Sequence, residues 1–402
     1  MQGVADTYVD LFTEYVIGGV RASLAQVRAH EYVVPDDVRE QAWHVLSFAL
    51  EVEAAWAATK ELLLELAPKM EQGGFRETWI PYLEQGVRKS VESRDWTAEN
   101  ELCYQIGLLY RLLNKHDSAR VWLSRALNNH VLDKSTRAQI FNQFAYLEWQ
   151  QGDVSRSIEY ARSALQLIDD LHVERAMAFS VLGLIAVERS QWQEAESYHR
   201  QALQIRETSG AQRQVAQSLQ NLAVALRCQN RFAEAINAFR QARLIFEQIG
   251  DKTSNAIASM NLGLAKFYSG DVWAAFEQYE FAEAIFLKHD DLLNQARICV
   301  NFGLAYLKID RVEQAEQSFD RAVKLFAEIG NEGQRLNAVD GLALAYMAQN
   351  RYAEANKLLL QSLQDLSLAK DIPNHSRLEQ IMHEHLSQLE KAQEGQKLES
   401  PS

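Results

Sequence analysis

Proline, cysteine and long apolar runs are scarce in this chain, and each scarcity excludes a class of protein. Only five prolines occur in 402 residues, so little interrupts the helices that the abundant Ala, Leu, Gln and Glu favour. Only three cysteines occur, and they lie far apart, which argues against a disulfide framework or a zinc ribbon. No apolar run approaches the roughly 18 residues of a membrane-spanning helix.

An excess of positive charge is also lacking. The formal net charge is −13, whereas binding to nucleic acid or to an anionic membrane needs clustered Lys and Arg. The first residues, MQGVADTYVDLF, have no basic segment ahead of an apolar core, so no secretory signal is expected. We predict a cytoplasmic protein whose partners are neither nucleic acid nor membrane.

Motifs that carry chemistry are missing as well. The glycine pairs at 18–19 and 73–74 lack the Lys and the preceding strand of a phosphate-binding loop. His383 and His385 are two residues apart, which places them on different faces of a helix, whereas the zinc-protease motif places two histidines on one face. No Ser or Cys lies in a recognisable nucleophile turn. We therefore predict that the protein is not an enzyme and has no cofactor or metal.

What the chain does contain is a repeat. A small residue recurs at spacings of 38 or 40 residues, and we number each unit so that this residue is position eight. Self-similarity at this period indicates a solenoid of supersecondary units. The seven residues at position eight are Gly107, Ala145, Gly183, Ala223, Gly263, Gly303 and Ala343.

Two further positions in each unit are expected to pack against position eight. Small residues on facing helices let the backbones approach, and a large residue fills the space beside them. The small residues twelve positions on are Ala119, Ser157, Ala195, Ala235, Ala275, Ala315 and Ala355. The residues sixteen on are Leu123, Ala161, His199, Phe239, Tyr279, Phe319 and Leu359, where we expect His199 to be a packed core residue.

The turn inside each unit is equally regular. Residue types that tolerate a left-handed backbone or cap a helix recur seven positions after the reference residue. They are Asn114, Gly152, Ser190, Asn230, Gly270, Asp310 and Asn350. Each unit is therefore predicted to be a helix, a turn and a second helix.

This pattern resembles the tetratricopeptide repeat in its longer form of about forty residues. The segments NLGLAKFYSGDVWAAFEQYEFAEAIF from Asn261 and NFGLAYLKIDRVEQAEQSFDRAVKLF from Asn301 match it well, with small residues at eight, twenty and twenty-seven and an aromatic residue at twenty-four. The resemblance implies an all-α, right-handed solenoid with seven clear units over residues 99–370. It also implies an interaction scaffold whose first helices line a concave groove.

The remaining segments are expected to close the two ends. Residues 59–98 read as a degenerate hairpin, with Gly73 and Gly74 at the turn, Thr78 at the small position and Tyr82 at the aromatic one. Residues 1–58 are predicted to form a helical cap, with its first helix interrupted near 18–19. A final helix is expected from Ile372 over 371–393, followed by a polar tail at 394–402.

By resemblance to the family, positions two, five, nine, twelve and thirteen face the groove. Position nine is apolar or aromatic in all seven units, so the groove is predicted to suit an apolar partner segment. The candidate groove residues are Tyr104, Arg111, Tyr146, Trp149, Arg227, Ile257, Met260, Leu264, Phe267, Arg297, Val300, Leu304, Leu307 and Lys308.

Each feature of this groove has a second interpretation. The apolar side chains could pack on neighbouring first helices or on the protein's own ends. The amides of Gln105, Gln143, Asn221, Asn261 and Asn301 could bond a guest backbone, but we favour bonds to carbonyls of the preceding repeat. The four cations of the set could bind a guest's carboxylates or pair with acidic residues on a solvated rim, the commoner case.

The sequence thus predicts a non-enzymatic scaffold that binds a peptide or an amphipathic helix in its groove. The rival hypothesis is a regulatory sensor, since long repeats also resemble those of bacterial peptide-sensing regulators and of the sensor regions of multidomain signalling ATPases. Its output would then lie in the N-terminal helices or in a partner chain. Apolar terminal units also allow the chain to form a homo-oligomer.

Overall fold

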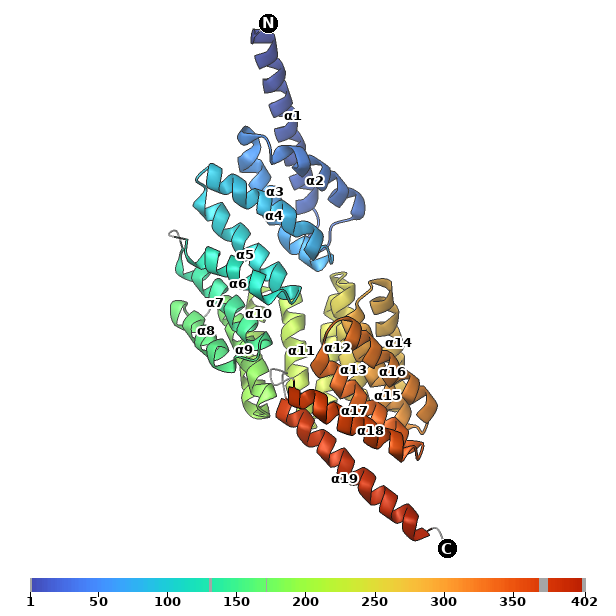
Figure 1. Ribbon diagram of the computed structural model, residues 1–402. Coiled ribbons are helices and arrows are strands. Elements are labelled where there is room, and N and C mark those ends of the chain that lie inside the picture. Colours follow the sequence, from blue (N-terminus) through green and yellow to red (C-terminus); the bar gives the residue numbers. More distant parts are fainter. Residues whose placement is uncertain (1, 130–131, 171, 369–374, 400–402) are drawn as a thin grey trace. The chain divides into compact units, whose positions relative to one another are not determined.

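A computed structural model describes residues 2–129, 132–170, 172–368 and 375–399 (Figure 1). In this part of the chain every regular element is a helix and no strand occurs. The chain divides into two compact units, which are described separately. Unit 1 comprises residues 1–214 and 248–251, and unit 2 comprises residues 215–247 and 252–402.

Unit 1 begins with two helices and a short 3₁₀ turn, and continues as four helical hairpins. Its elements are α1 (Gln2–Arg28), α2 (Asp36–Ala49), η1 (Glu53–Ala55), α3 (Trp56–Gln72), α4 (Arg76–Glu92), α5 (Trp96–Leu112), α6 (His116–Leu127), α7 (Lys134–Gln150), α8 (Val154–Leu167), α9 (Glu174–Glu188) and α10 (Trp192–Ser209).

Unit 2 contains four hairpins and a long final helix. Its elements are α11 (Gln212–Cys228, of which the first three residues belong to unit 1), α12 (Phe232–Gln248), α13 (Lys252–Tyr268), α14 (Val272–Lys288), α15 (Leu292–Lys308), α16 (Val312–Glu328), α17 (Glu332–Ala348), α18 (Tyr352–Leu368) and α19 (His375–Glu399).

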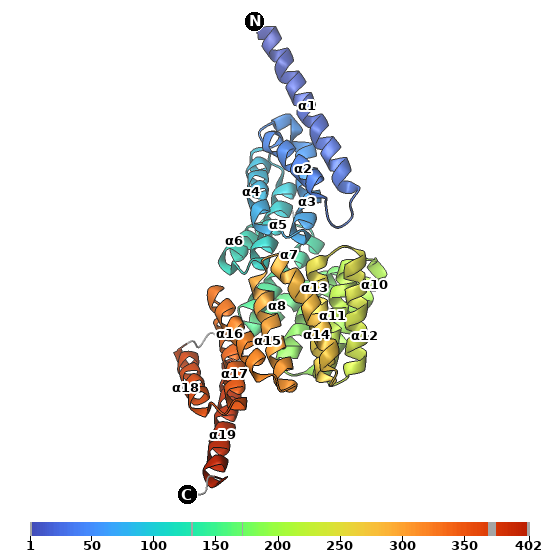
Figure 2. The same ribbon diagram turned by 90° about the vertical axis from the view of Figure 1, so that its right-hand side faces the viewer.

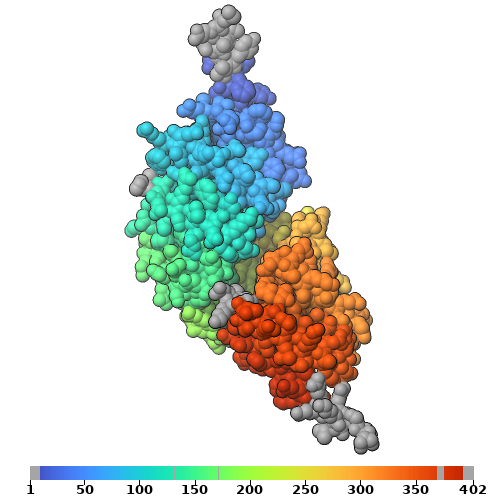
Figure 3. All heavy atoms as spheres, viewed as in Figure 1, coloured from blue at the N-terminus to red at the C-terminus, as the bar shows by residue number. Residues whose placement is uncertain are grey.

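Within each unit, consecutive helices pack against each other in sequence order. In unit 1, α5 packs on α6, α6 on α7, α7 on α8, and α8 on α9. In unit 2 the same order runs from α13 through α19, and the paired helices lie side by side in both ribbon views (Figures 1 and 2). Side chains fill the spaces between the helices on the face seen in Figure 3. The predicted all-α repeat solenoid is confirmed.

The contact predicted between position eight and the large residue of the second helix is present. A Cβ added at Gly263 would lie 2.5 Å from Tyr279, and one at Gly303 would lie 2.6 Å from Phe319. At Gly183 the nearest atom would be a carbon of the His199 ring, 2.4 Å away. Real Cβ atoms do not approach that closely, so glycine is required at these three positions.

The seven predicted turn residues all adopt the left-handed backbone. Their φ values lie between 56° and 96°, a region that costs most L-residues about 1 to 2 kcal/mol but suits Gly, Asn and Asp. The amide of the residue directly before the second helix then closes the turn, as when Lys115 N–H donates to the carbonyl of Tyr110 over 2.9 Å. The turn positions read from the sequence are therefore confirmed.

The expected interruption of the first helix is wrong. α1 continues through Gly18 and Gly19 from Gln2 to Arg28, and its stripe of Val16, Val20, Leu24 and Val27 is buried in the core shared with α2 and α3. A glycine inside a helix costs about 1 kcal/mol relative to alanine. Burial of the apolar side chains contributes about 1.5 to 3 kcal/mol each, so tertiary packing outweighs the local preference.

The register predicted for the degenerate hairpin is also wrong, by one residue. Gly74, with φ of 85°, occupies the left-handed turn position, whereas Gly73 does not. Counting five residues on from Gly74, as in the other hairpins, gives the fully buried Trp79 rather than Thr78, which is exposed. Leu83 takes the large position and is also fully buried.

The C-terminal helix is longer than expected. α19 runs from His375 to Glu399, so it includes most of the segment predicted to be a polar tail. Its buried Leu378, Met382 and Leu389 share a core with α17 and α18. The predicted start at Ile372 and the last residues, 400–402, lie outside the described part of the chain.

Candidate functional site

The fourteen predicted groove residues fall into two sets, one in each unit. Tyr104 and Arg111 lie on α5, and Tyr146 and Trp149 lie on α7, all in unit 1. The other ten lie on α11, α13 and α15 of unit 2. The structure therefore presents two local clusters, and each is described within its own unit.

In unit 1 the predicted residues bond to one another. Arg111 Nε donates to the Gln143 side-chain oxygen over 2.9 Å, and Gln143 Nε2 donates to the Tyr104 hydroxyl over 3.2 Å. The Arg111 guanidinium also lies 4.9 Å from the centre of the Tyr146 ring, within the range of a cation–π contact. Burial lowers the pKa of Arg111 and raises the pKa of Tyr104. This cluster uses its polar groups inside the fold.

In unit 2 the apolar residues are shared between the core and the surface. Val300, Leu304 and Leu307 are half-buried and pack against a cluster that contains Phe319. Met260 is buried, whereas Leu264 on the neighbouring turn of α13 is half-buried. Part of the predicted apolar face thus holds adjacent repeats together, and part remains accessible to a partner.

The amide side chains differ between the units. Gln105 donates to Glu101 of its own helix over 3.1 Å, and Gln143 donates to Tyr104 as described. Asn221, Asn261 and Asn301 are half-buried, and no side-chain hydrogen bond joins them to any residue that the structure describes. The favoured interpretation, bonds to carbonyls of the preceding repeat, is therefore wrong within the described ranges.

The three predicted groove cations of unit 2, Arg227, Arg297 and Lys308, make no ion pair with a described residue. Arg227 lies 5.6 Å from the centre of the Tyr268 ring, and the side chains of Arg297 and Lys308 are exposed. The acidic residue at position five of α17, Asp340, is bonded to His385 of α19, with 2.6 Å between Oδ1 and Nδ1. The expected pairing with acidic residues on the rim does not occur here.

We name the accessible side of these first helices the ladder face. It comprises the predicted groove positions two, nine, twelve and thirteen of α11, α13, α15 and α17 in unit 2 and adds position six, which carries the asparagines. Position five is left out, because Met260 and Asp340 there are buried. The included positions hold three cations and no acidic residue, although acidic residues outnumber basic ones in the whole chain. The ladder face therefore combines free amides, half-buried apolar side chains and positive charge.

Two of the three cysteines, Cys103 and Cys299, are buried. Burial raises the pKa of the thiols of Cys103 and Cys299, which leaves little thiolate at neutral pH. Among the described residues, no three His, Cys, Asp or Glu side chains are grouped to hold a metal ion. His383 is exposed, while His385 faces Asp340. None of the described helices is long and apolar enough to cross a membrane.

Two family models for the tetratricopeptide repeat match this sequence. One matches residues 136–208, 174–248 and 214–288, and the other matches residues 101–128 and 296–328. The chain belongs to the tetratricopeptide repeat family. The matches together cover more than half of the chain, and the α17–α18 hairpin beyond them keeps the same turn geometry.

Several solved structures share this fold. A Rap protein complexed with competence and sporulation factor superposes with a TM-score of 0.56 at 16% identity, over 86% of this chain and 98% of its own. Aspartyl phosphate phosphatase F from Bacillus subtilis gives 0.54 at 14% identity, over 87% and 93%.

A signal transduction ATPase with a tetratricopeptide repeat sensor, from Pyrococcus horikoshii, gives a TM-score of 0.56 at 14% identity. It covers 87% of this chain and 57% of its own. A comparison with curated proteins finds no match. At these identities the similarity establishes the fold alone.

Proposed function

We propose that the ladder face of unit 2 captures an extended peptide segment. The observation that carries this proposal is the row of Asn221, Asn261 and Asn301, which are partly accessible and have no hydrogen-bond partner among the described residues. A primary amide both donates and accepts, so it can bond the N–H and C=O groups of a peptide backbone. Since these amides are partly accessible and bonded to no described residue, they are available to a guest.

The amides favour an extended guest over a helical one. The backbone groups of a helix are bonded within the helix, so a row of amides would find few of them free. An extended chain rises about 3.3 Å per residue, and packed helices lie about 8 to 10 Å apart. Each step from one first helix to the next therefore corresponds to about three peptide residues.

The neighbouring side chains supply the rest of the binding energy. Leu264 and Leu304 lie three positions after Asn261 and Asn301 on the same helices, and both are half-buried. Burying the rest of such a side chain against an apolar guest contributes on the order of 1 kcal/mol. The positive charge of the ladder face adds a preference for an anionic peptide.

This proposal is tested with a synthetic pool of random peptides about fifteen residues long, which can cross all four first helices, measured by affinity selection on immobilised protein. We expect Leu264→Glu with Leu304→Glu to abolish peptide retention, because both carboxylates would enter the apolar strip. Asn261→Ala with Asn301→Ala should weaken retention about tenfold or more, since each lost hydrogen bond costs about 1 kcal/mol.

Asn237→Ala is the matched control, because Asn237 is exposed on the second helix α12. Both double variants should keep the helical circular dichroism of the wild type. Unchanged retention by the two double variants would disprove capture at the ladder face.

A second candidate function is a regulatory sensor whose output lies in the N-terminal helices. An ion cluster in unit 1 favours it: Arg213 binds Glu71 of α3 over 3.0 Å and Asp251 over 2.8 Å. It joins a helix near the N-terminus to residues 142 and 180 positions along the chain. Peptide-induced changes in the amide exchange of α1 to α3 would support this function. Unchanged exchange would exclude it and would favour a scaffold that binds the peptide without transmitting a signal.

A further inference from the structure

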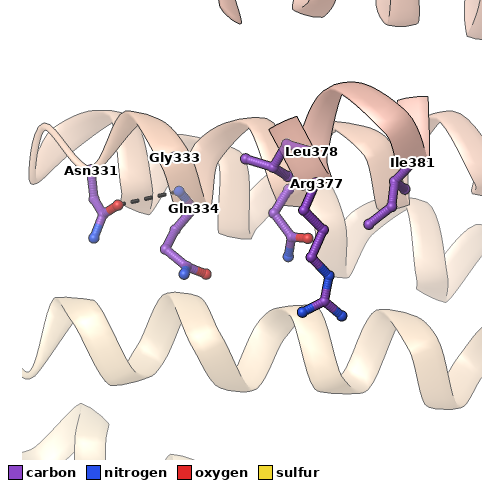
Figure 4. A pocket seen from close by; sticks show the side chains of 7 residues that line it. Asn331, Gly333, Gln334, Arg377, Leu378 and Ile381 are labelled. Atoms are coloured by element: carbon purple, nitrogen blue, oxygen red, sulfur yellow. Dashed lines mark hydrogen bonds between the residues drawn. The ribbon is translucent and has the colours of Figure 1, made fainter. Parts of the chain in front are cut away.

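A pocket of about 410 Å³ lies between the first turns of α17 and α19 in unit 2 (Figure 4). The guanidinium of Arg377 and the side chain of Gln334 extend into the space below the two helices in this view, and the apolar Leu378 and Ile381 flank Arg377. Its described lining is Asn331, Gly333, Gln334, Asn337, Arg377, Leu378 and Ile381.

This pocket continues the ladder face by one further repeat. α19 packs on α17 and α18, as α17 packs on α15 and α16, so it takes the place of a first helix. Arg377 follows Asn337 by forty residues, and Asn337 follows Arg297 by forty. Arg377 thus occupies position two of an eighth first helix, in line with a cation already on the ladder face.

The polar groups of the pocket suit a carboxylate. Arg377 is exposed and makes no ion pair with a described residue. The side-chain amides of Gln334 and Asn337 make no hydrogen bond with a described residue. The first turn of α17 adds the backbone N–H groups of Glu332 and Gly333, because that of Gln334 donates to Asn331 Oδ1 over 3.2 Å and that of Arg335 donates to the Asn331 carbonyl over 2.9 Å. A guanidinium accepts a carboxylate through two parallel hydrogen bonds.

We propose that this pocket binds the C-terminal carboxylate of the peptide held on the ladder face. The inference rests on the proposed function and adds a direction to it. The peptide would run along α11, α13, α15 and α17 with its last residue at α19, where Leu378 and Ile381 contact the last side chain. Arg377 is then the residue that selects a free peptide end over an internal segment of a protein.

The test compares three synthetic pools of peptides about fifteen residues long on the wild type: random peptides with a free carboxylate, the same peptides amidated, and amidated peptides that end in Asp. We expect the free-acid pool to be retained about tenfold to a hundredfold more than the amidated one, because a hydrogen-bonded charge is lost. Arg377→Gln should remove this difference, and Arg377→Lys should restore part of it.

Arg240→Gln on α12 is the control, since Arg240 is exposed and outside the pocket. Equal retention of free-acid and amidated pools, unaffected by Arg377→Gln, would overturn the carboxylate pocket and leave peptide capture intact. A second contrary outcome is that the amidated peptides that end in Asp are retained as well as the free-acid peptides, and only when Arg377 is present. That result would show that the pocket binds any carboxylate and would overturn its assignment to the peptide's C-terminus. Retention of no pool would overturn both proposals.

Discussion

At the scale of single residues, His199 departs most from the repeat. It occupies the position filled by Phe239, Tyr279 and Phe319 in other units, and it is fully buried against Gly183. Neither ring nitrogen has a described partner, and burial lowers the pKa of the imidazole to about 4. The ring therefore acts as an aromatic filler that must stay neutral in the folded chain.

The first prediction concerns His199 and acid. The unfolded chain takes up a proton near pH 6.5, whereas the folded chain does so only near pH 4. Stability is therefore full above pH 6.5 and falls as the pH drops through this window, by about 2 kcal/mol at pH 5. His199→Phe should remove this loss, as measured by urea unfolding of both proteins at pH 7 and pH 5.

The control for this prediction is His383→Phe, because His383 is exposed on α19. If the free-energy difference between His199→Phe and the wild type is the same at both pH values, the buried neutral histidine is not the cause.

Residue types predicted the turn conformations correctly, but they did not predict the hydrogen-bond partners of the asparagine side chains. Asn, Asp, Ser and Gly at one repeated position indicate a left-handed backbone because few residues tolerate it, and all seven have positive φ. The hydrogen bonds of Asn221, Asn261 and Asn301 depend on which groups of the adjoining helices lie within reach. That depends on tertiary packing, which residue type does not encode.

At the scale of elements, the predictions made from local residue preferences were wrong where burial of distant side chains determines the structure. The glycine pair of α1 and the one-residue shift in α4 both follow from side chains far apart in sequence, such as Leu63 and Leu102, which crowd Gly86 of α4. A Cβ at Gly86 would lie 2.8 Å from Leu63. The periodic hairpins were predictable because the same packing contacts recur in each repeat. The two ends of the chain were not predictable, because their packing contacts occur only once.

The second prediction concerns the attachment of α19. The bond to Asp340 raises the pKa of His385, so this contribution to stability is complete below about pH 6.5 and is lost as the pH rises through the folded pKa. Amide exchange of α19, corrected for intrinsic rates, should therefore increase between pH 6 and pH 9. His385→Gln should make α19 exchange equally at both pH values.

The control here is α16, whose helix contains no histidine. Equal protection of α19 at pH 6 and pH 9 in the wild type would show that the His385–Asp340 bond does not hold the helix.

At the scale of the whole molecule, long-range order in unit 1 depends on a few charges. Glu71 binds both Arg213 and Arg76, each over 3.0 Å, and both Glu71 and Asp251 are buried. Ion pairs between buried groups are costly to break because the remaining charge has lost its water.

The third prediction is that Arg213→Gln destabilises unit 1 by about 1.5 to 3 kcal/mol, the value of hydrogen bonds to charged groups. Adding Glu71→Gln and Asp251→Asn should recover part of this loss, since neutral amides tolerate burial better than unpaired carboxylates. The measurement is the midpoint of urea unfolding followed by tryptophan fluorescence.

Arg240→Gln again serves as the exposed control. A triple variant no more stable than Arg213→Gln would mean that the arginine acts through packing rather than through charge.

The contact between a glycine and the ring of the facing helix, and the turn that places it, recur at nearly constant spacing. Each hairpin consequently meets its neighbours through interchangeable surfaces. A duplication or deletion of one period in the coding DNA would change the number of hairpins and leave the remaining junctions intact. Under the proposed peptide capture, each added or removed hairpin would change the length of the bound peptide by about three residues without rebuilding the core.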